Sequence, residues 1–154
     1  MYVENQIGVL AKITGLFSGK NYNLDSISVG ETEDKTVSRI TMGLTCDNLT
    51  YEQILKQLNR SVEVIKVLDF TNMPIHKKEL MFIKVNLDNE TEKNEIFRLA
   101  QTFKFDVIDY NGKTAVIQAI NNDKENEQLI QLFENYFKNE IEVVRSGSIA
   151  IEKI

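Results

Sequence analysis

Apolar side chains along the first half of the chain recur with two different periods. Helical spacing over residues 8–20, and again over "LTYEQILKQLNR" at 49–60, predicts two amphipathic helices. Between them, "NLDSISVG" and "TVSRITMGL" are rich in β-forming residues, and Ile40, Met42 and Leu44 alternate as one buried strand face does. With "MYV" in front and "SVEVIKVLDF" behind, we expect the element order βαββαβ.

Each predicted helix of this half has an apolar face. For the first helix the face consists of Val9, Leu10, Ile13, Leu16 and Phe17, and for the second of Tyr51, Ile54, Leu55 and Leu58. Thr50 is the predicted N-cap of the second helix, because a hydroxyl can accept from the free N–H groups of the first turn. Only about three residues precede Glu4, so either the first strand is short or the natural start of the chain lies upstream of Met1.

The second half repeats this rhythm. "ELMFIKVNL" alternates as a strand, "TEKNEIFRLAQTF" has helical spacing with Thr91 as a predicted cap, and Asn111-Gly112 is a strong hairpin turn within "FDVIDYNGKTAVIQAI". "NEQLIQLFENYF" predicts another helix, and "IEVVRSGSIAIEKI" a closing strand. The inward positions expected for the two helices are Ile96, Leu99, Ala100, Phe103, Leu129, Leu132, Phe133 and Tyr136.

The only proline, Pro74, lies in "TNMPIHKK", which has no apolar periodicity. We therefore predict a domain at 1–72, a linker at 73–78 and a second domain at 79–154. The fold class is α+β, with two ferredoxin-like βαββαβ domains in tandem, each with helices on one face of an antiparallel sheet. Units of about 70–77 residues have marginal cores, so their free sheet faces and edges favour oligomerisation.

Composition narrows the function classes. A net charge of −5 argues against a nucleic-acid surface, and no apolar run is long enough to span a membrane. Glu4, Asn5 and Gln6 interrupt any signal-peptide core. A single cysteine, Cys46, excludes an internal disulfide framework and fits a reducing compartment, so we expect a cytoplasmic protein.

Catalytic or metal-binding patterns are weak. "NGKT" at 111–114 lacks the first glycine of a P-loop, and the single histidine and single cysteine cannot build a zinc site. Cys46 has no paired base, which favours an inert thiol. The acidic residues Glu31, Glu33 and Asp34 are interpreted as a solvated turn.

The stretch "ENQIGVLAKITGLFSGKNYNLDSISVG" suits a free amino acid. A helix start offers N–H groups to a carboxylate, Gly8 permits close approach, and the amides of Asn5 and Asn23 can accept from an ammonium or donate to a carboxylate. Neutral amides also hold a net-neutral ligand without burying an uncompensated charge. On chemistry alone, however, a cap, a turn glycine and a strand-entry residue explain these positions at least as well.

The same stretch, followed by "DKTVSRITM", closely resembles the N-terminal ACT domain of the small regulatory subunit of acetolactate (acetohydroxyacid) synthase. "VVRSG" at residues 143–147 is similar to a C-terminal signature of that family, with valine for alanine. The matching N-terminal positions are Glu4, Asn5, Gly8, Leu10, Gly15, Leu16, Phe17, Ser18, Tyr22, Asn23, Leu24, Ser26, Ile27, Ser38, Arg39, Ile40 and Thr41.

The resemblance implies a homodimer that binds valine, or another branched-chain amino acid, between two ACT domains. It also implies a partner, the large catalytic subunit, which this chain would activate and make sensitive to feedback inhibition. Thiamine diphosphate, Mg²⁺ and FAD are expected in that partner, and no cofactor, metal or catalytic residue in this chain. The effector-site residues implied by position are Asn5, Gly8, Val9, Leu10, Asn23, Ser28 and Gly30.

Two other interpretations stay open. The chain could be a stand-alone ACT-domain sensor that regulates another enzyme or transcription, which a pull-down without a thiamine-diphosphate enzyme would favour. It could also be a small enzyme on a ferredoxin-like fold, which turnover by the isolated chain would support.

Overall fold

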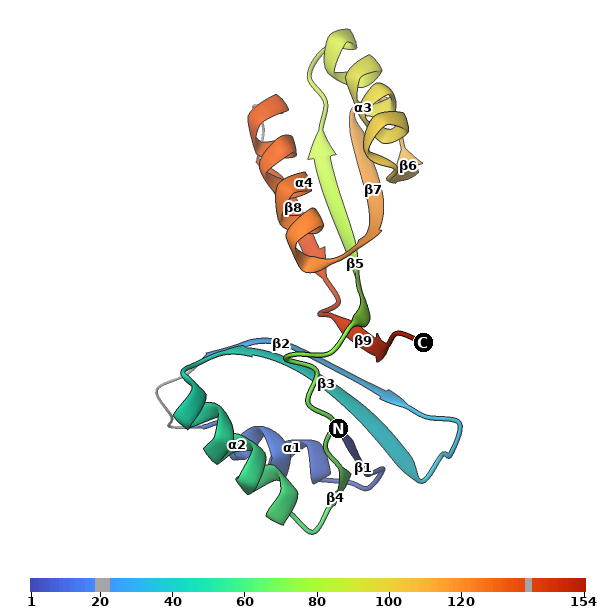
Figure 1. Cartoon of the computed structure of the whole chain (residues 1–154). Coiled ribbons are helices and arrows are strands. Elements are labelled where there is room, and N and C mark those ends of the chain that lie inside the picture. The colour runs from blue at the N-terminus through green and yellow to red at the C-terminus, as the bar shows by residue number, and fades with distance from the viewer. Residues whose placement is uncertain (19–22, 138–139) are drawn as a thin grey trace. The chain divides into compact units, whose positions relative to one another are not determined.

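The chain folds into two compact units, each described by itself. A computed structural model describes residues 1–18, 23–137 and 140–154 (Figure 1). One unit comprises Met1–His76 together with Ser148–Ile154, and the other comprises Lys77–Gly147. The C-terminal residues 148–154 thus group with the N-terminal unit, whereas the sequence pattern predicts them in the second domain. The predicted limits 1–72 and 79–154 stay predictions.

The N-terminal unit is a four-stranded antiparallel sheet with two helices on one face (Figure 1). The strand order is β2-β3-β1-β4, so β1 is central and β2 is an edge strand. The elements are β1 (Tyr2–Glu4), α1 (Val9–Gly15), β2 (Asn23–Glu31), β3 (Val37–Thr45), α2 (Asn48–Arg60) and β4 (Val64–Lys66). This order confirms βαββαβ. The predicted first helix extended to residue 20, and residues 19 and 20 lie outside the described residues.

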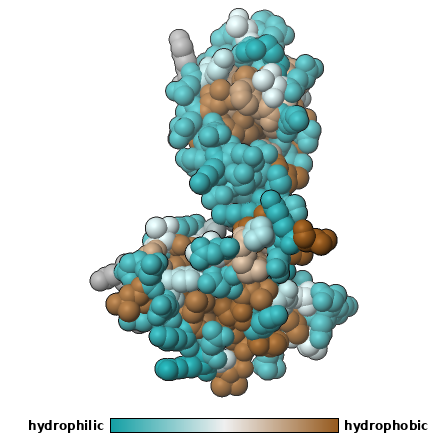
Figure 2. All heavy atoms as spheres, in the orientation of Figure 1, coloured by the Kyte–Doolittle hydropathy of each residue, from teal (hydrophilic) through white to brown (hydrophobic). Residues whose placement is uncertain are grey.

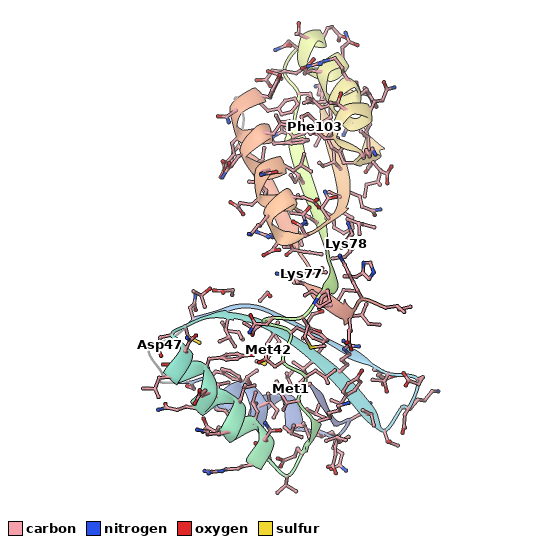
Figure 3. The ribbon with its side chains drawn as sticks, in the orientation of Figure 1. Met1, Met42, Asp47, Lys77, Lys78 and Phe103 are labelled. Carbon is pink, nitrogen blue, oxygen red and sulfur yellow. The ribbon has the colours of Figure 1, made fainter. Side chains whose placement is uncertain are left out.

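The register of β2 against β3 separates the two faces of this sheet. Ile27 pairs with Met42, and both pack against the hydrophobic core on the helix side (Figure 3). Ser28 pairs with Thr41 one position along, and because successive side chains alternate, that pair lies on the helix-free face. The buried core residues are Val3, Val9, Ile13, Ile40, Ile54 and Leu58.

The second unit repeats this topology. Its strand order is β6-β7-β5-β8, which is the N-terminal order β2-β3-β1-β4 shifted along the chain. The elements are β5 (Ile75–Asn86), α3 (Glu90–Phe103), β6 (Asp106–Tyr110), β7 (Thr114–Asn121), α4 (Asp123–Tyr136) and β8 (Ile141–Arg145), and the first two residues of β5 group with the N-terminal unit. Two ferredoxin-like units in tandem, and with them the α+β fold class, are confirmed. β5 begins at Ile75, inside the segment predicted as a linker.

The last strand, β9 (Ile149–Glu152), belongs to the N-terminal unit. Its Ala150 carbonyl accepts from Nη2 of Arg39 on β3 at 2.5 Å, and the Lys153 N–H donates to the Pro74 carbonyl at 3.0 Å. Arg39 also lies over the Tyr2 ring, 5.3 Å from its centroid. Since Arg39 and Thr41 share the helix-free face of the sheet, the C-terminal segment approaches the N-terminal unit from that face.

The predicted helix caps were wrong by two or three residues. α2 is capped by Asp47 (Figure 3), whose side chain accepts from the N–H of Thr50 at 2.8 Å. α3 is capped by Asn89, whose Oδ1 accepts from the Glu92 N–H at 2.9 Å, so Thr91 lies inside the helix. In both cases an Asx side chain upstream of the predicted threonine has the extended backbone that a cap requires.

This correction predicts a difference between two neighbouring substitutions. Asn89→Ala should destabilise the second unit by about 1 kcal/mol, because it leaves a first-turn N–H of α3 without its acceptor. Thr91→Ala, at an exposed position inside the helix, should change the free energy of unfolding by less than about 0.5 kcal/mol. Urea titrations of both variants measure the difference, and a larger loss for Thr91→Ala would restore the original assignment.

Two aromatic residues predicted to point inward are half-exposed. Phe103, at the end of α3 (Figure 3), is 48% exposed, and Tyr136, at the end of α4, is 47% exposed. In each case the helix ends and an aromatic residue just beyond it packs instead: Phe105 and Phe137 lie with ring centroids 5.5 and 5.2 Å from that of Phe133. The predicted residue is in each case the last residue of its helix, and the core position is filled instead by an aromatic side chain that follows the helix.

Hydrophobic residues are exposed on both units, and Figure 2 shows such groups on one face of the molecule. None of the helices in the described ranges is long and apolar enough to cross a membrane.

Candidate functional site

Asn5, in the loop after β1, is hydrogen-bonded to the turn that connects β2 and β3. The Asn5 backbone N–H donates to the Thr36 carbonyl at 2.7 Å. Its side-chain Nδ2 donates to the Lys35 carbonyl at 2.9 Å and to Oε1 of Glu31 at 3.2 Å. The amide N–H groups are therefore used within the chain, and among the described residues the amide oxygen, Oδ1, has no hydrogen-bond partner. Asn5 can offer a ligand an acceptor, but not a donor.

The acidic turn between β2 and β3 is held by its own hydrogen bonds. The N–H and hydroxyl of Thr36 donate to Oδ1 of Asp34 at 2.9 and 2.7 Å, and the Thr32 hydroxyl donates to the Asp34 carbonyl at 2.9 Å. Two hydrogen bonds hold the pKa of Asp34 below its usual range. The one from the Thr36 hydroxyl has the larger effect and the one from the Thr36 N–H the smaller. This turn was interpreted only as solvated, so the contact of Glu31 with Asn5 was missed.

Gly8 lies between this loop and α1 in the left-handed region, with φ 86° and ψ −9°. Residues with a Cβ rarely adopt that conformation, which explains glycine at this position. Among the described residues, none lies within 4 Å of a Cβ built on Gly8, so a side chain at this position has space around its first atom. Within the described part of the chain, the N–H groups of Leu10 and Ala11 in the first turn have no acceptor, so they are free for an anionic group.

The predicted residues of α1 differ in burial. Val9 is 4% exposed and belongs to the hydrophobic core, so its side chain cannot line a site in solvent. Leu10 is 44% exposed at the start of the helix. Leu10 is therefore the apolar side chain of this pair that a ligand could contact.

Strand β2 separates the remaining predicted residues. Gly30 adjoins Glu31 at the end that meets Asn5, and Ser28 lies two residues further along on the same face. Asn23 begins the strand, and eight steps of about 3.3 Å place it about 26 Å from Glu31. One protomer thus brings Asn5, Gly8 and Gly30 to one end of the sheet and leaves Asn23 at the other; Tyr22 lies outside the described residues.

The other chemical candidates have structural roles. The "NGKT" segment is the β6–β7 hairpin turn, with Gly112 at φ 82° and Oδ1 of Asn111 accepting from the Thr114 N–H at 2.8 Å. Partial burial and, to a smaller extent, the negative charge of Asp47 raise the pKa of the Cys46 thiol. A raised pKa opposes formation of a reactive thiolate. Over residues 1–18, 23–137 and 140–154, no three His, Cys, Asp or Glu side chains are grouped so as to hold a metal ion.

Comparisons with known proteins agree with this architecture. A family model described as AHAS small subunit-like ACT domain matches residues 1–66, and one described as small subunit of acetolactate synthase matches residues 78–154. The acetolactate synthase small subunit of Aquifex aeolicus is 34% identical over 151 residues, which is 98% of this chain and 78% of that protein. That of Bacillus subtilis is 38% identical over 152 residues, 98% of this chain and 87% of that protein.

A crystal structure of the acetolactate synthase small subunit from Thermotoga maritima superposes with a TM-score of 0.86 at 34% sequence identity. The match covers 100% of this chain and 94% of that one. Both halves of the sequence and the whole fold therefore point to one family with a regulatory role in the enzyme. The chain belongs to the family of acetolactate synthase small subunits.

Proposed function

We propose that this chain activates the thiamine-diphosphate-dependent large subunit of acetolactate synthase in the cytoplasm and makes it sensitive to valine. Family membership supports the regulatory role. The observation that carries the effector site is the placement of Asn5 and Asn23 at opposite ends of the edge strand β2. A site that uses both residues requires two copies of the chain.

Edge pairing of two β2 strands would bring the two asparagines together. In the strand order of the described sheet, β2 is an edge strand with β3 beside it. Its other edge can therefore pair with a second copy of the chain. An antiparallel two-fold pairing centred on Ile27 places Asn23 of the partner subunit opposite Glu31, beside Asn5. The same operation forms an identical site at the other end of the interface. This pairing would form a homodimer with two effector sites.

The groups at each end suit a branched-chain amino acid. The free N–H groups of Leu10 and Ala11 can receive the ligand carboxylate, and Oδ1 of Asn5 can accept from its ammonium. The exposed Leu10 side chain can contact the apolar group of valine, isoleucine or leucine. Thiamine diphosphate, Mg²⁺ and FAD belong to the large subunit in this proposal, and this chain supplies no catalytic group.

Mixing the two subunits tests the proposal. The chain alone should not condense pyruvate, whereas addition to its cognate large subunit should raise the rate and confer inhibition by valine. The measurement is acetolactate formation with and without valine, together with the molar mass of the small subunit in solution. No change in rate or inhibition on mixing would contradict the proposal and favour a stand-alone sensor of amino acids.

A further inference from the structure

We propose that Glu31, together with Oδ1 of Asn5, forms an acceptor pair that selects the ammonium of an amino acid against the 2-oxo acid with the same side chain. The inference rests on the proposed effector site and adds the residue that decides which ligand class the site admits. Glu31 lies at the end of β2, where the sequence indicated only a solvated acidic turn.

The orientation of the Asn5 amide is the first step. The Lys35 carbonyl and the Glu31 carboxylate, at 2.9 and 3.2 Å, can only accept hydrogen bonds, so the amide nitrogen must face them. The reverse orientation would set Oδ1 against two acceptor oxygens. The oxygen of Asn5 is therefore held away from the turn, free to accept from a ligand.

The second step is the charge of Glu31. Its carboxylate receives the Asn5 amide on Oε1, and among the described residues it forms no ion pair with a lysine or arginine. The site thus presents two neighbouring acceptor groups with one net negative charge. An ammonium has three donors and a positive charge, which this arrangement can satisfy.

A 2-oxo acid lacks the hydrogen-bond donors that the Asn5 and Glu31 oxygens require. A 2-oxo acid carries a carbonyl oxygen where the amino acid carries the ammonium, and that oxygen can only accept. Placed beside Asn5 and Glu31, it would face two further acceptors and leave them without a donor. Sites that hydrogen-bond a donor discriminate strongly against analogues that lack it. For this partly exposed site we expect 2-oxo-3-methylbutanoate to bind at least about 100-fold more weakly than L-valine.

Glu31→Gln tests the role of the charge and keeps the geometry. The amide oxygen of glutamine can still accept from Asn5, so the orientation of Asn5 is retained while the negative charge is lost. We expect valine to bind about five- to tenfold more weakly, since a charge-assisted hydrogen bond is roughly twice as strong as a neutral one. Affinity for 2-oxo-3-methylbutanoate should stay the same or rise, so the selectivity falls.

The control is Glu33→Gln, which removes one carboxylate from the same exposed turn and should leave both affinities unchanged. Calorimetry on the full chain measures the affinities of the wild type and of both variants for L-valine and for 2-oxo-3-methylbutanoate, six values in all. Equal weakening of both ligands in Glu31→Gln would assign Glu31 a structural role and overturn the inference. Failure of the wild-type chain to bind valine, alone and with the large subunit, would instead overturn the proposed function and this inference with it.

Discussion

Replacing Arg145 by leucine is expected to destabilise the second unit by about 3 kcal/mol at pH 7. Arg145 ends β8 and makes a two-point contact with Glu79: Nε donates to Oε1 at 3.1 Å and Nη2 to Oε2 at 2.8 Å. The Glu79 side chain is 4% exposed, so removal of Arg145 leaves a buried carboxylate without its cation. Breaking a buried ion pair by removing one partner costs about 3–5 kcal/mol. Because the Arg145 side chain is 34% exposed, we expect a loss at the lower end of this range.

The pH dependence of this loss has a defined sign. Burial alone would raise the pKa of Glu79, but the hydrogen bonds from Arg145 and Asn126 outweigh it and hold the pKa below its ordinary value of 4.5. In the wild type, the contribution of Glu79 is therefore present at neutral pH and lost as the pH falls through its lowered pKa. In Arg145→Leu, burial is no longer offset, so Glu79 takes up a proton more readily. The stability difference between the two proteins should shrink as the pH is lowered.

Two further variants complete the test of this pair. Glu79→Leu combined with Arg145→Leu should be more stable than Arg145→Leu alone, because no unpaired charge is left behind. Lys84→Leu, which breaks an exposed pair with Glu142 at 3.6 Å, should have little effect. Urea titrations between pH 4 and pH 7 give the free energies of unfolding. A double variant no better than Arg145→Leu would show that the leucine itself, and not the orphaned carboxylate, causes the loss.

Gly8→Asp is expected to abolish measurable valine binding. Aspartate would place a negative charge in front of the free N–H groups of Leu10 and Ala11, where the proposed site receives the ligand carboxylate. The backbone contributes separately, because φ 86° at Gly8 is unfavourable for a residue with a Cβ. A Cβ at this position meets no described residue of the same protomer within 4 Å, so any clash must come from the ligand or a second copy.

Gly8→Asn separates the charge from the backbone. Asparagine has almost the same size as aspartate and tolerates the left-handed region comparably, but it is neutral. It should therefore retain part of the valine affinity that Gly8→Asp loses. Calorimetry with valine and activation of the large subunit are the two measurements, and activation should persist in both variants if it uses other surfaces. Identical loss of binding in both would assign the effect to the backbone or to bulk instead of to charge.

Much of the fold follows from local sequence. Alternation in "ELMFIKVNL" and helical spacing in "YEQILKQL" report which side of an element faces the core, and the Asn111-Gly112 turn needs no distant partner to be recognised. Element ends were less well predicted, because two competing polar residues lie within a few positions at each cap. Phe105 and Phe137 show the same limit, since side chains beyond a helix end can take the core position that periodicity assigns to the helix.

The residues of the proposed effector site show the same division between local sequence and tertiary structure. The sequence by itself determined the family resemblance and the residues Asn5, Gly8 and Asn23, because they lie in one continuous motif. Only the tertiary structure decided that Asn5 bonds to Glu31 and Lys35, and that Asn23 lies about 26 Å away at the other end of β2. It also brought Arg145 to Glu79 and Arg39 to β9. The physical reason is that strand register joins residues far apart in the chain, and no local pattern of side chains encodes which strands will meet.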